Sequence, residues 1–121
     1  MKRDMDLIRK MVLLIEEHPT AWAPDIKIDG CTADQIGYHS YLLVESGLAV
    51  GHDMTCTGNT GPFYSINHLT PAGHDFADSV RSQYVWNEVM GQVKEKGLGS
   101  VTLDIAKKML DKALRKRLEI D

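Results

Sequence analysis

The sequence has few of the features that define several protein classes. It contains only two cysteines, Cys31 and Cys56, and no CxxC pair, so neither a disulfide framework nor a zinc ribbon is indicated. No apolar run approaches the ~20 residues that span a bilayer, and the chain opens on a charged amphipathic segment rather than a signal-peptide core. We therefore expect a cytoplasmic protein with buried free thiols and no membrane partner.

The sequence also lacks a recognisable catalytic or metal-binding motif. Metal sites need three or four converging ligands, and no H-x-x-E-H or C-x-x-C spacing occurs. His39 lies on or near the apolar face of its helix, where we expect a core histidine bonded to the backbone rather than a ligand. We expect no catalytic residues, no metal, no cofactor and no enzymatic activity. The only residues that an enzyme could use for catalysis here are His52, Asp53, Cys56, His68 and His74.

Positive charge is missing from the middle of the chain. Residues 28–80 contain six acidic residues and no lysine or arginine, and we call this segment the acidic block. Residues 1–27 carry five basic and five acidic residues, whereas residues 81–121 carry nine basic and six acidic ones. The only candidate cations of the acidic block are four histidines, which are mostly neutral near pH 7.

Hydrophobic periodicity predicts an α+β chain. Thr32 and Gln35 have the spacing of a capping box at a helix start, and Gly47 is placed as a left-handed helix stop. Residues 57–61 are a strong turn signal, and Trp22 is expected to anchor a loop onto the core. The expected helices span residues 4–17, 32–46, 71–81, 85–96 and 102–118, and the expected strands span residues 26–29, 48–50 and 63–69.

The order of these elements resembles a winged-helix domain. Residues 36–48, I-x-x-H-x-x-x-L-x-E-S-G-L, are similar to the recognition helix of winged-helix regulators. Residues 69–76, L-T-P-x-G-x-x-F, are similar to the segment that follows the wing in many of them. The resemblance implies a winged-helix-like core over residues 1–81, with residues 82–121 as a helical extension packed on the core.

Nearly the whole chain is also similar to a family of small bacterial and phage or prophage proteins classed as a domain of unknown function. The similarity lies in the opening MKRDMDLIR, in Y-H-x-x-L-L-x-x-x-G-L over residues 38–48, and in G-H-D-F-x-D from Gly73 followed by Val85-Trp86. This resemblance implies a winged-helix-like core and a mobile-element context, and it provides no catalytic residues to transfer.

A winged-helix regulator would bind DNA through the helix that starts near Thr32, with residues 51–62 as the wing. Such binding depends on lysine and arginine side chains that neutralise phosphates. Both elements lie in the acidic block, so this docking mode is disfavoured. DNA contacts would instead come from basic residues near the two ends of the chain, namely Lys2, Arg3, Arg9, Lys10, Arg115 and Lys116.

The favoured hypothesis is a regulatory protein-binding module. Asp34, Tyr38, Tyr41 and Asp53 would present an acidic, aromatic surface to a basic partner. Tyrosine is favoured at interfaces because it buries a large area at low entropic cost. In a phage setting, such a surface would inhibit a host protein by occupying its nucleic-acid site.

The last predicted helix has apolar residues over more of its circumference than one core contact needs. Two interpretations stay open: a fully packed helix, or a helix that pairs with a second copy or another protein. Its basic residues alternate with acidic ones, which favours a solvated face over a phosphate-binding patch. A homodimer would use Met109, Leu110, Ala113 and Leu114.

Overall fold

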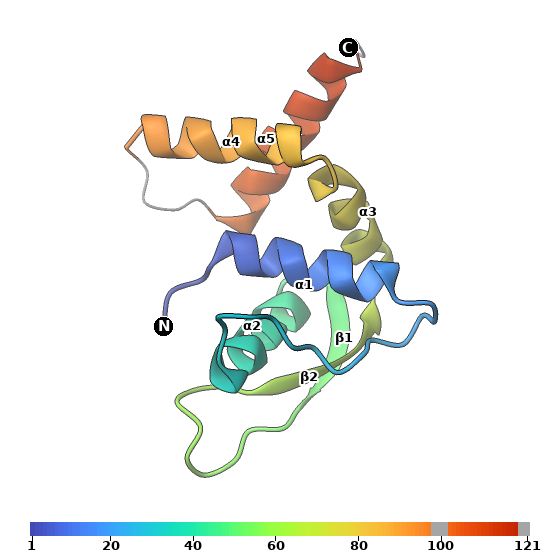
Figure 1. Ribbon diagram of the computed structural model, residues 1–121, viewed down its shortest axis with the longest axis vertical. Helices are drawn as coiled ribbons and strands as arrows, with labels where there is room; N and C mark the ends of the chain where they lie inside the picture. Colours follow the sequence, from blue (N-terminus) through green and yellow to red (C-terminus); the bar gives the residue numbers. More distant parts are fainter. Residues whose placement is uncertain (98–101, 119–121) are drawn as a thin grey trace. The chain divides into compact units, whose positions relative to one another are not determined.

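The computed structural model describes residues 1–97 and 102–118 (Figure 1). In this part of the chain it contains five α-helices and one two-stranded antiparallel sheet, which confirms the α+β class and is compatible with a winged-helix-like arrangement. The chain divides into two compact units, Met1–Ala77 and Asp78–Asp121. The elements are α1 (Met5–Glu17), α2 (Ala33–Glu45), β1 (Ala49–Asp53), β2 (Tyr64–Leu69), α3 (Pro71–Val80), α4 (Gln83–Glu95) and α5 (Leu103–Arg117).

Helix α1 forms because its apolar residues recur at helical spacing and its first turn is capped. The Asp4 carboxylate accepts a hydrogen bond from the Leu7 amide at 3.1 Å, which satisfies one of the free amides at the helix start. Its buried face, which packs against α2 and β2, supplies much of the core of the first unit. The buried residues are Met5, Leu7, Ile8, Met11, Val12 and Ile15.

Helix α2 begins with the predicted capping box. The Thr32 hydroxyl accepts the Gln35 amide at 3.1 Å, and the Gln35 side chain accepts the Thr32 amide at 2.7 Å. The helix is followed by Gly47, whose φ of 77° lies in the left-handed region, as expected for a glycine stop. Both ends of the helix were therefore predicted correctly.

His39 is buried in the core and links α2 to the start of α1. Its Nε2 accepts the Asp4 amide at 2.9 Å, so the ring proton sits on Nδ1, which donates to the Gln35 carbonyl at 2.8 Å. Both ring nitrogens are thus satisfied by backbone groups while the ring is neutral. This confirms the prediction of a core histidine bonded to the backbone.

The sheet is a hairpin with a bulge. Val50 pairs with His68 and Gly51 pairs with Ile66, so Asn67 has no partner on β1. Strand β1 continues through Gly51 to Asp53, beyond the strand expected at residues 48–50. A Cβ at Gly51 would overlap the Ser65 carbonyl oxygen, so the absence of a side chain permits the close pairing.

A threonine also caps the start of α3, directly before Pro71. The Thr70 hydroxyl donates to the Gly47 carbonyl at 2.6 Å and accepts the Gly73 amide at 3.1 Å. The proline occupies the first helical position, where its missing amide costs nothing. Thr70 therefore ties the start of α3 to the end of α2.

Helices α4 and α5 pack against each other. The hydroxyls of Ser82 and Thr102 cap their first turns by accepting the amides of Val85 at 3.2 Å and Ile105 at 3.2 Å. Thr102 is therefore the cap of α5, and Ser100, the other candidate in the sequence, lies outside the described residues. The buried residues are Val85, Trp86, Val89 and Val93 on α4, and Leu103, Ala106 and Leu110 on α5.

Three expectations for the first unit are wrong. Residues 26–29 form no strand, because the described coil before α2 makes one backbone bond to β2 and makes it earlier, from the Ala23 amide to the Asn67 carbonyl. Trp22 is no core anchor, since it is 66% exposed and touches the His68 ring only edge-on. The free thiols are not both buried, because Cys56 is exposed and Cys31 is half-buried.

Candidate functional site

The outer side of α2 places two tyrosines beside a third from β2. The Tyr38 and Tyr41 rings lie 5.7 Å apart between centroids, and the Tyr41 and Tyr64 rings lie 5.2 Å apart in an edge-to-face arrangement. Tyr38 and Tyr41 share a helix face because they are three residues apart. All three side chains are half-buried, and we call this cluster the tyrosine face.

Acidic residues border the tyrosine face. The pKa of Tyr64 is raised, first by burial and then by the negative charges of Asp53 and Glu45. Each of these causes disfavours the phenolate form. The sequence analysis named Tyr38, Tyr41 and Asp53 as contact residues. The structure adds Tyr64 to this group, which the sequence had placed only in the strand expected at residues 63–69.

Asp34 holds the tip of the hairpin to the first turn of α2. Its carboxylate accepts hydrogen bonds from the Asn59 side-chain amide at 2.9 Å and from the Thr60 hydroxyl at 3.0 Å. These two bonds, with the Asn59 bond the larger cause, lower the pKa of Asp34 because they favour the charged form. The sequence analysis predicted this carboxylate as a partner contact, whereas in the structure it is bonded within the chain.

Asp53 plays a similar part at the base of the same loop. Its carboxylate accepts both the Thr55 hydroxyl at 2.5 Å and the Thr55 amide at 2.8 Å. These bonds, the hydroxyl bond first, lower the pKa of Asp53. The residue is exposed, so its charge still faces solvent beside Tyr64.

The histidines considered as candidates for chemistry contact different residues in the structure. Within residues 1–97 and 102–118, no group of three or more histidine, cysteine, aspartate or glutamate side chains is arranged to hold a metal ion. His52 Nδ1 lies 3.0 Å from Asn67 Oδ1, and His74 Nδ1 lies 3.5 Å from Glu16 Oε2. Among the described helices, none has the length and apolarity needed to cross a membrane.

The basic residues named as DNA contacts lie outside the acidic block. Lys2 and Lys10 are exposed, whereas Arg3 and Arg9 are half-buried at the start of the chain and on α1. On α5, Lys116 is exposed. Arg115 forms an ion pair with Asp111 at 2.9 Å.

The apolar residues of α5 differ in their burial. Leu110 is fully buried within the chain, and its predicted part in a homodimer stays a prediction. Met109, Ala113 and Leu114 are half-buried. The apolar surface left over on α5 comes instead from Ile105, which is 47% exposed, and Leu118, which is 65% exposed.

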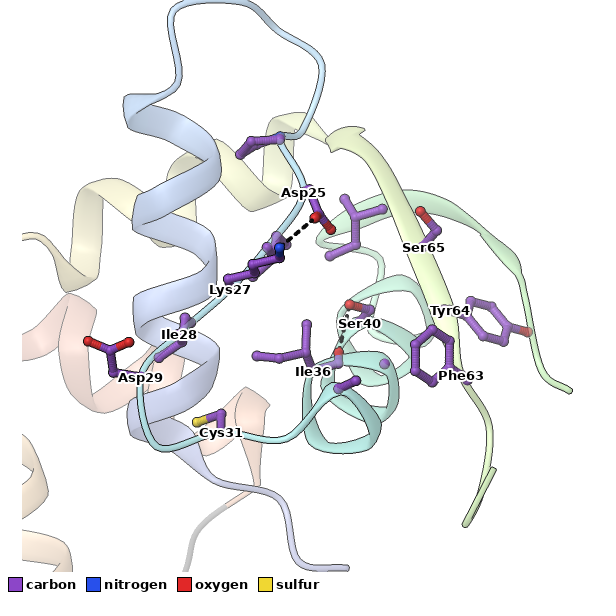
Figure 2. Close-up of a pocket in the computed structure, with 15 residues that line it drawn as sticks. Asp25, Lys27, Ile28, Asp29, Cys31, Ile36, Ser40, Phe63, Tyr64 and Ser65 are labelled. Atoms are coloured by element: carbon purple, nitrogen blue, oxygen red, sulfur yellow. Dashed lines mark hydrogen bonds and ion pairs between the residues drawn. The ribbon is translucent and has the colours of Figure 1, made fainter. Parts of the chain in front are cut away.

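A groove beside β2 was not predicted from the sequence. It has a volume of about 440 Å³ and is lined by residues 24–29 and Cys31, by the first half of α2, and by residues 63–66. In Figure 2 the coil through Lys27 and Ile28 forms one wall, β2 with Phe63 and Tyr64 forms the other, and Ile36 lies between them. We call it the edge groove. The Ile26 and Ile28 alternation pointed to this region but was interpreted as a paired strand.

The comparisons with known proteins agree with the predicted resemblance to a family of unknown function. The chain is 31% identical over 112 residues to an "Uncharacterized protein" of Haemophilus influenzae (strain ATCC 51907 / DSM 11121 / KW20 / Rd), covering 90% of this chain and 92% of that protein. No solved structure matches. The predicted link to phages stays a prediction. The family model described as "Hypothetical protein (DUF2513)" matches residues 2–99, so the chain belongs to this family.

Proposed function

We propose that this protein is a non-enzymatic binding module of winged-helix-like design that recognises a basic protein surface through its tyrosine face. The observation that supports this most is the combination of three adjoining tyrosine rings, a carboxylate border and an acidic block without lysine or arginine. The tyrosines would provide contact area, and the carboxylates would select a positively charged partner.

The tyrosine face is suited to protein contact because it is already ordered. Half-buried rings that pack on one another have few conformations to lose on binding, so the entropic cost of an interface is low. The hairpin next to α2 is held by the Asp34 bonds to Asn59 and Thr60. A partner would therefore meet a preformed surface.

The same surface is unsuited to nucleic acid. A DNA-binding protein gains much of its affinity from cations that displace phosphate counterions. In the position of a recognition helix, α2 instead carries Asp34 and Glu45, and the hairpin adds Asp53. A polyanion would meet like charge there. A basic surface that itself binds nucleic acid is the partner class that this arrangement favours.

DNA binding through other elements is the second candidate function. The last turn of α5 carries Arg115, Lys116 and Arg117, and the start of the chain carries Lys2 and Lys10. Arg115 is paired with Asp111, and the Arg117 guanidinium lies 4.3 Å from the Tyr84 ring centroid. Since these contacts already engage two of the three cations at the end of α5, this helix end would make weak, salt-dependent phosphate contacts rather than a specific site.

Site-specific photo-crosslinking in the native host tests the ranking. A benzophenone amino acid would replace Tyr41 in one variant and Tyr84 in the matched control, because Tyr84 is an exposed tyrosine, at 64%, outside the tyrosine face. We expect the Tyr41 variant to crosslink to a protein through a lysine- and arginine-rich surface, and to form less adduct in a cell extract when salt is raised before irradiation.

The control separates specific capture from general stickiness. The Tyr84 variant should not capture that protein, and added duplex DNA should compete if the captured surface is one that binds nucleic acid. Crosslinks from the Tyr41 position to DNA, or the same proteins captured at both positions, would contradict the proposed function.

A further inference from the structure

The sheet has a free edge on the side of β2 that faces away from β1. Two backbone bonds identify the hydrogen-bonded pairs at the two ends of the β1–β2 ladder. The Met54 amide donates to the Phe63 carbonyl at 2.8 Å, and the Thr70 amide donates to the Leu48 carbonyl at 3.0 Å. By the alternation of an antiparallel ladder, Tyr64 and Ile66 are then non-hydrogen-bonded partners of Asp53 and Gly51. Their amide and carbonyl groups therefore point away from β1, towards the edge groove.

These backbone groups have no partner among the described residues. The Ala23 amide donates to the Asn67 carbonyl at 2.7 Å, and this is the one backbone bond between residues 18–31 and β2 in the described part of the chain. Beyond that bond, the coil through Ile26 and Ile28 is separated from β2 by the edge groove. The groove therefore lies where a third strand beside β2 would pair, and the bond between Ala23 and Asn67 closes one end of it.

The floor and walls of the groove are apolar. Ile26, Ile28, Ile36 and Phe63 line it and are all half-buried. Phe63 can lie against α2 because Gly37 has no side chain, and a Cβ there would overlap the ring. A strand bound in the edge groove would place every second side chain against this apolar floor and the others towards solvent.

The rim of the groove is acidic. Asp25 and Asp29 lie on the coil wall, and the one lysine there, Lys27, is 3.8 Å from Asp25 in a highly exposed pair. The lining residues of α2 and β2 carry no charge, so the two aspartates and one lysine of the coil give the groove its net negative charge. The outward side chains of an added strand would be favoured if they were basic.

We propose that the edge groove binds an extended segment of another protein, with lysine or arginine alternating with apolar residues, as a third strand beside β2. Main-chain bonds to Tyr64 and Ile66 supply affinity, and the apolar floor and acidic rim supply selectivity. This inference goes beyond the tyrosine face: it uses the main chain of Tyr64 but neither Tyr38 nor Tyr41. The two surfaces therefore succeed or fail separately.

Amide hydrogen exchange with a defined peptide tests the proposal. The probe is acetylated and amidated Lys-Val-Lys-Val-Lys-Val-Lys, added to the full chain. We expect the Tyr64 and Ile66 amides to exchange at least about tenfold more slowly with peptide, because each gains a hydrogen bond. Amides of the β1 and β2 ladder, such as that of His52, should be unaffected.

Two peptide controls identify the mode of binding. A peptide whose alternate amides are N-methylated, tested in both registers, keeps its charge but loses one row of main-chain donors, and one of the two registers should bind about tenfold more weakly or worse. A peptide with glutamate in place of lysine should also bind about tenfold more weakly, because the rim is acidic.

Variants of the protein locate the site. Ile28→Lys places a cation in the groove and should weaken the lysine–valine peptide about tenfold, whereas Ala21→Lys, on the exposed coil outside the groove, should change binding less than about twofold. An amide spectrum of Ile28→Lys, dispersed like that of the unmodified chain, verifies that the variant is folded.

Each contrary result overturns the proposal in a recognisable way. If the Tyr64 and Ile66 amides are as protected as the ladder without peptide, the edge is already paired in solution. If the peptide binds but perturbs only Tyr38 and Tyr41, and both N-methylated versions bind equally well, the groove is not the site while the proposed function stands. Absence of binding at millimolar peptide, or equal binding of the glutamate version, also rejects it.

Discussion

Helices α2 and α5 start in the same way but carry side chains of opposite charge. Thr32 caps α2 by accepting the Gln35 amide at 3.1 Å, and Thr102 caps α5 by accepting the Ile105 amide at 3.2 Å. Each has an aspartate in its first turn, where it complements the helix dipole. Helix α2 contains no lysine or arginine, whereas the last turn of α5 contains three basic residues.

The two helices also use their charges differently. The carboxylate of Asp34 on α2 is bonded to Asn59 and Thr60 in the hairpin tip, so it shapes the neighbouring surface. On α5, Asp104 and Asp111 pair with Lys108 and Arg115 one turn later, in exposed pairs that contribute little to stability. The comparison indicates that the character of a binding surface follows from side chains outside the core, even where the helix starts are alike.

The largest expected effect concerns the inner side of α5. Leu110→Ala removes a fully buried side chain, so we expect a loss of about 2–5 kcal/mol in the free energy of unfolding, measured by urea denaturation. Ile105→Ala, at a 47% exposed position of the same helix, should change it by about 0.5 kcal/mol or less. A Leu110→Ala variant with unchanged stability but a halved mass in light scattering would instead place this residue in a dimer interface.

The next effect concerns the outer side of α2. Once a partner has been captured through the Tyr41 position, Tyr41→Ala should weaken its binding by about 2 kcal/mol, or about 30-fold, as for a tyrosine at the centre of an interface. Isothermal titration calorimetry measures this loss. Tyr84→Ala is the matched control and should leave the affinity unchanged. Equal losses in the two variants would remove the distinction between the tyrosine face and the rest of the surface.

The carboxylate border of the tyrosine face can be tested by titration. Because the pKa of Tyr64 is raised in the fold, this group stabilises the folded chain below the ordinary tyrosine value of 10.0, and the contribution is lost as pH rises through the folded pKa. Asp53→Asn should lower the Tyr64 pKa only part of the way, since burial is the larger cause. NMR detection of the ring carbons follows this, and an unchanged pKa in the variant would contradict the proximity of the two groups.

The smallest expected effect is confined to the hairpin tip. The pKa of Asp34 is lowered, so its stabilising bonds to Asn59 and Thr60 are complete above the ordinary value of 3.8 and are lost as pH falls through the lower folded pKa. Amide exchange at residues 56–60 should rise, relative to the sheet, on acidification below about pH 4. Asp34→Asn should abolish this pH dependence. Its persistence in the variant would assign it to another group.

Much of the fold follows from local signals in the sequence. The capping box at Thr32, the glycine stop at Gly47 and the threonine before Pro71 each act within a few residues, and all three are present. The strand expected at residues 26–29 failed for a non-local reason. Alternation of Ile26 and Ile28 is compatible with a strand, but pairing depends on the distance to β2, which the sequence does not encode locally.

The candidate site was predicted in part for the same reason. Tyr38 and Tyr41 could be placed together because both lie on one helix. Tyr64 joins them only through the packing of β2 on α2. The bonds of Asp34 reach Asn59 and Thr60, which lie 25 and 26 positions further along the chain. The edge groove arises from a hydrogen-bond ladder that stops, and no residue pattern signals an unpaired edge.

Amide chemical-shift mapping with a random-sequence DNA duplex at low salt tests the central claim most directly. If α2 is a protein-binding surface, the amides of Tyr38, Tyr41 and Tyr64 should keep their positions throughout the titration, while any shifts fall at Lys2, Lys10 or the last turn of α5 and disappear as salt is added. Saturable shifts along α2 and the hairpin, persisting at physiological salt, would show that duplex DNA binds where the acidic block should repel it.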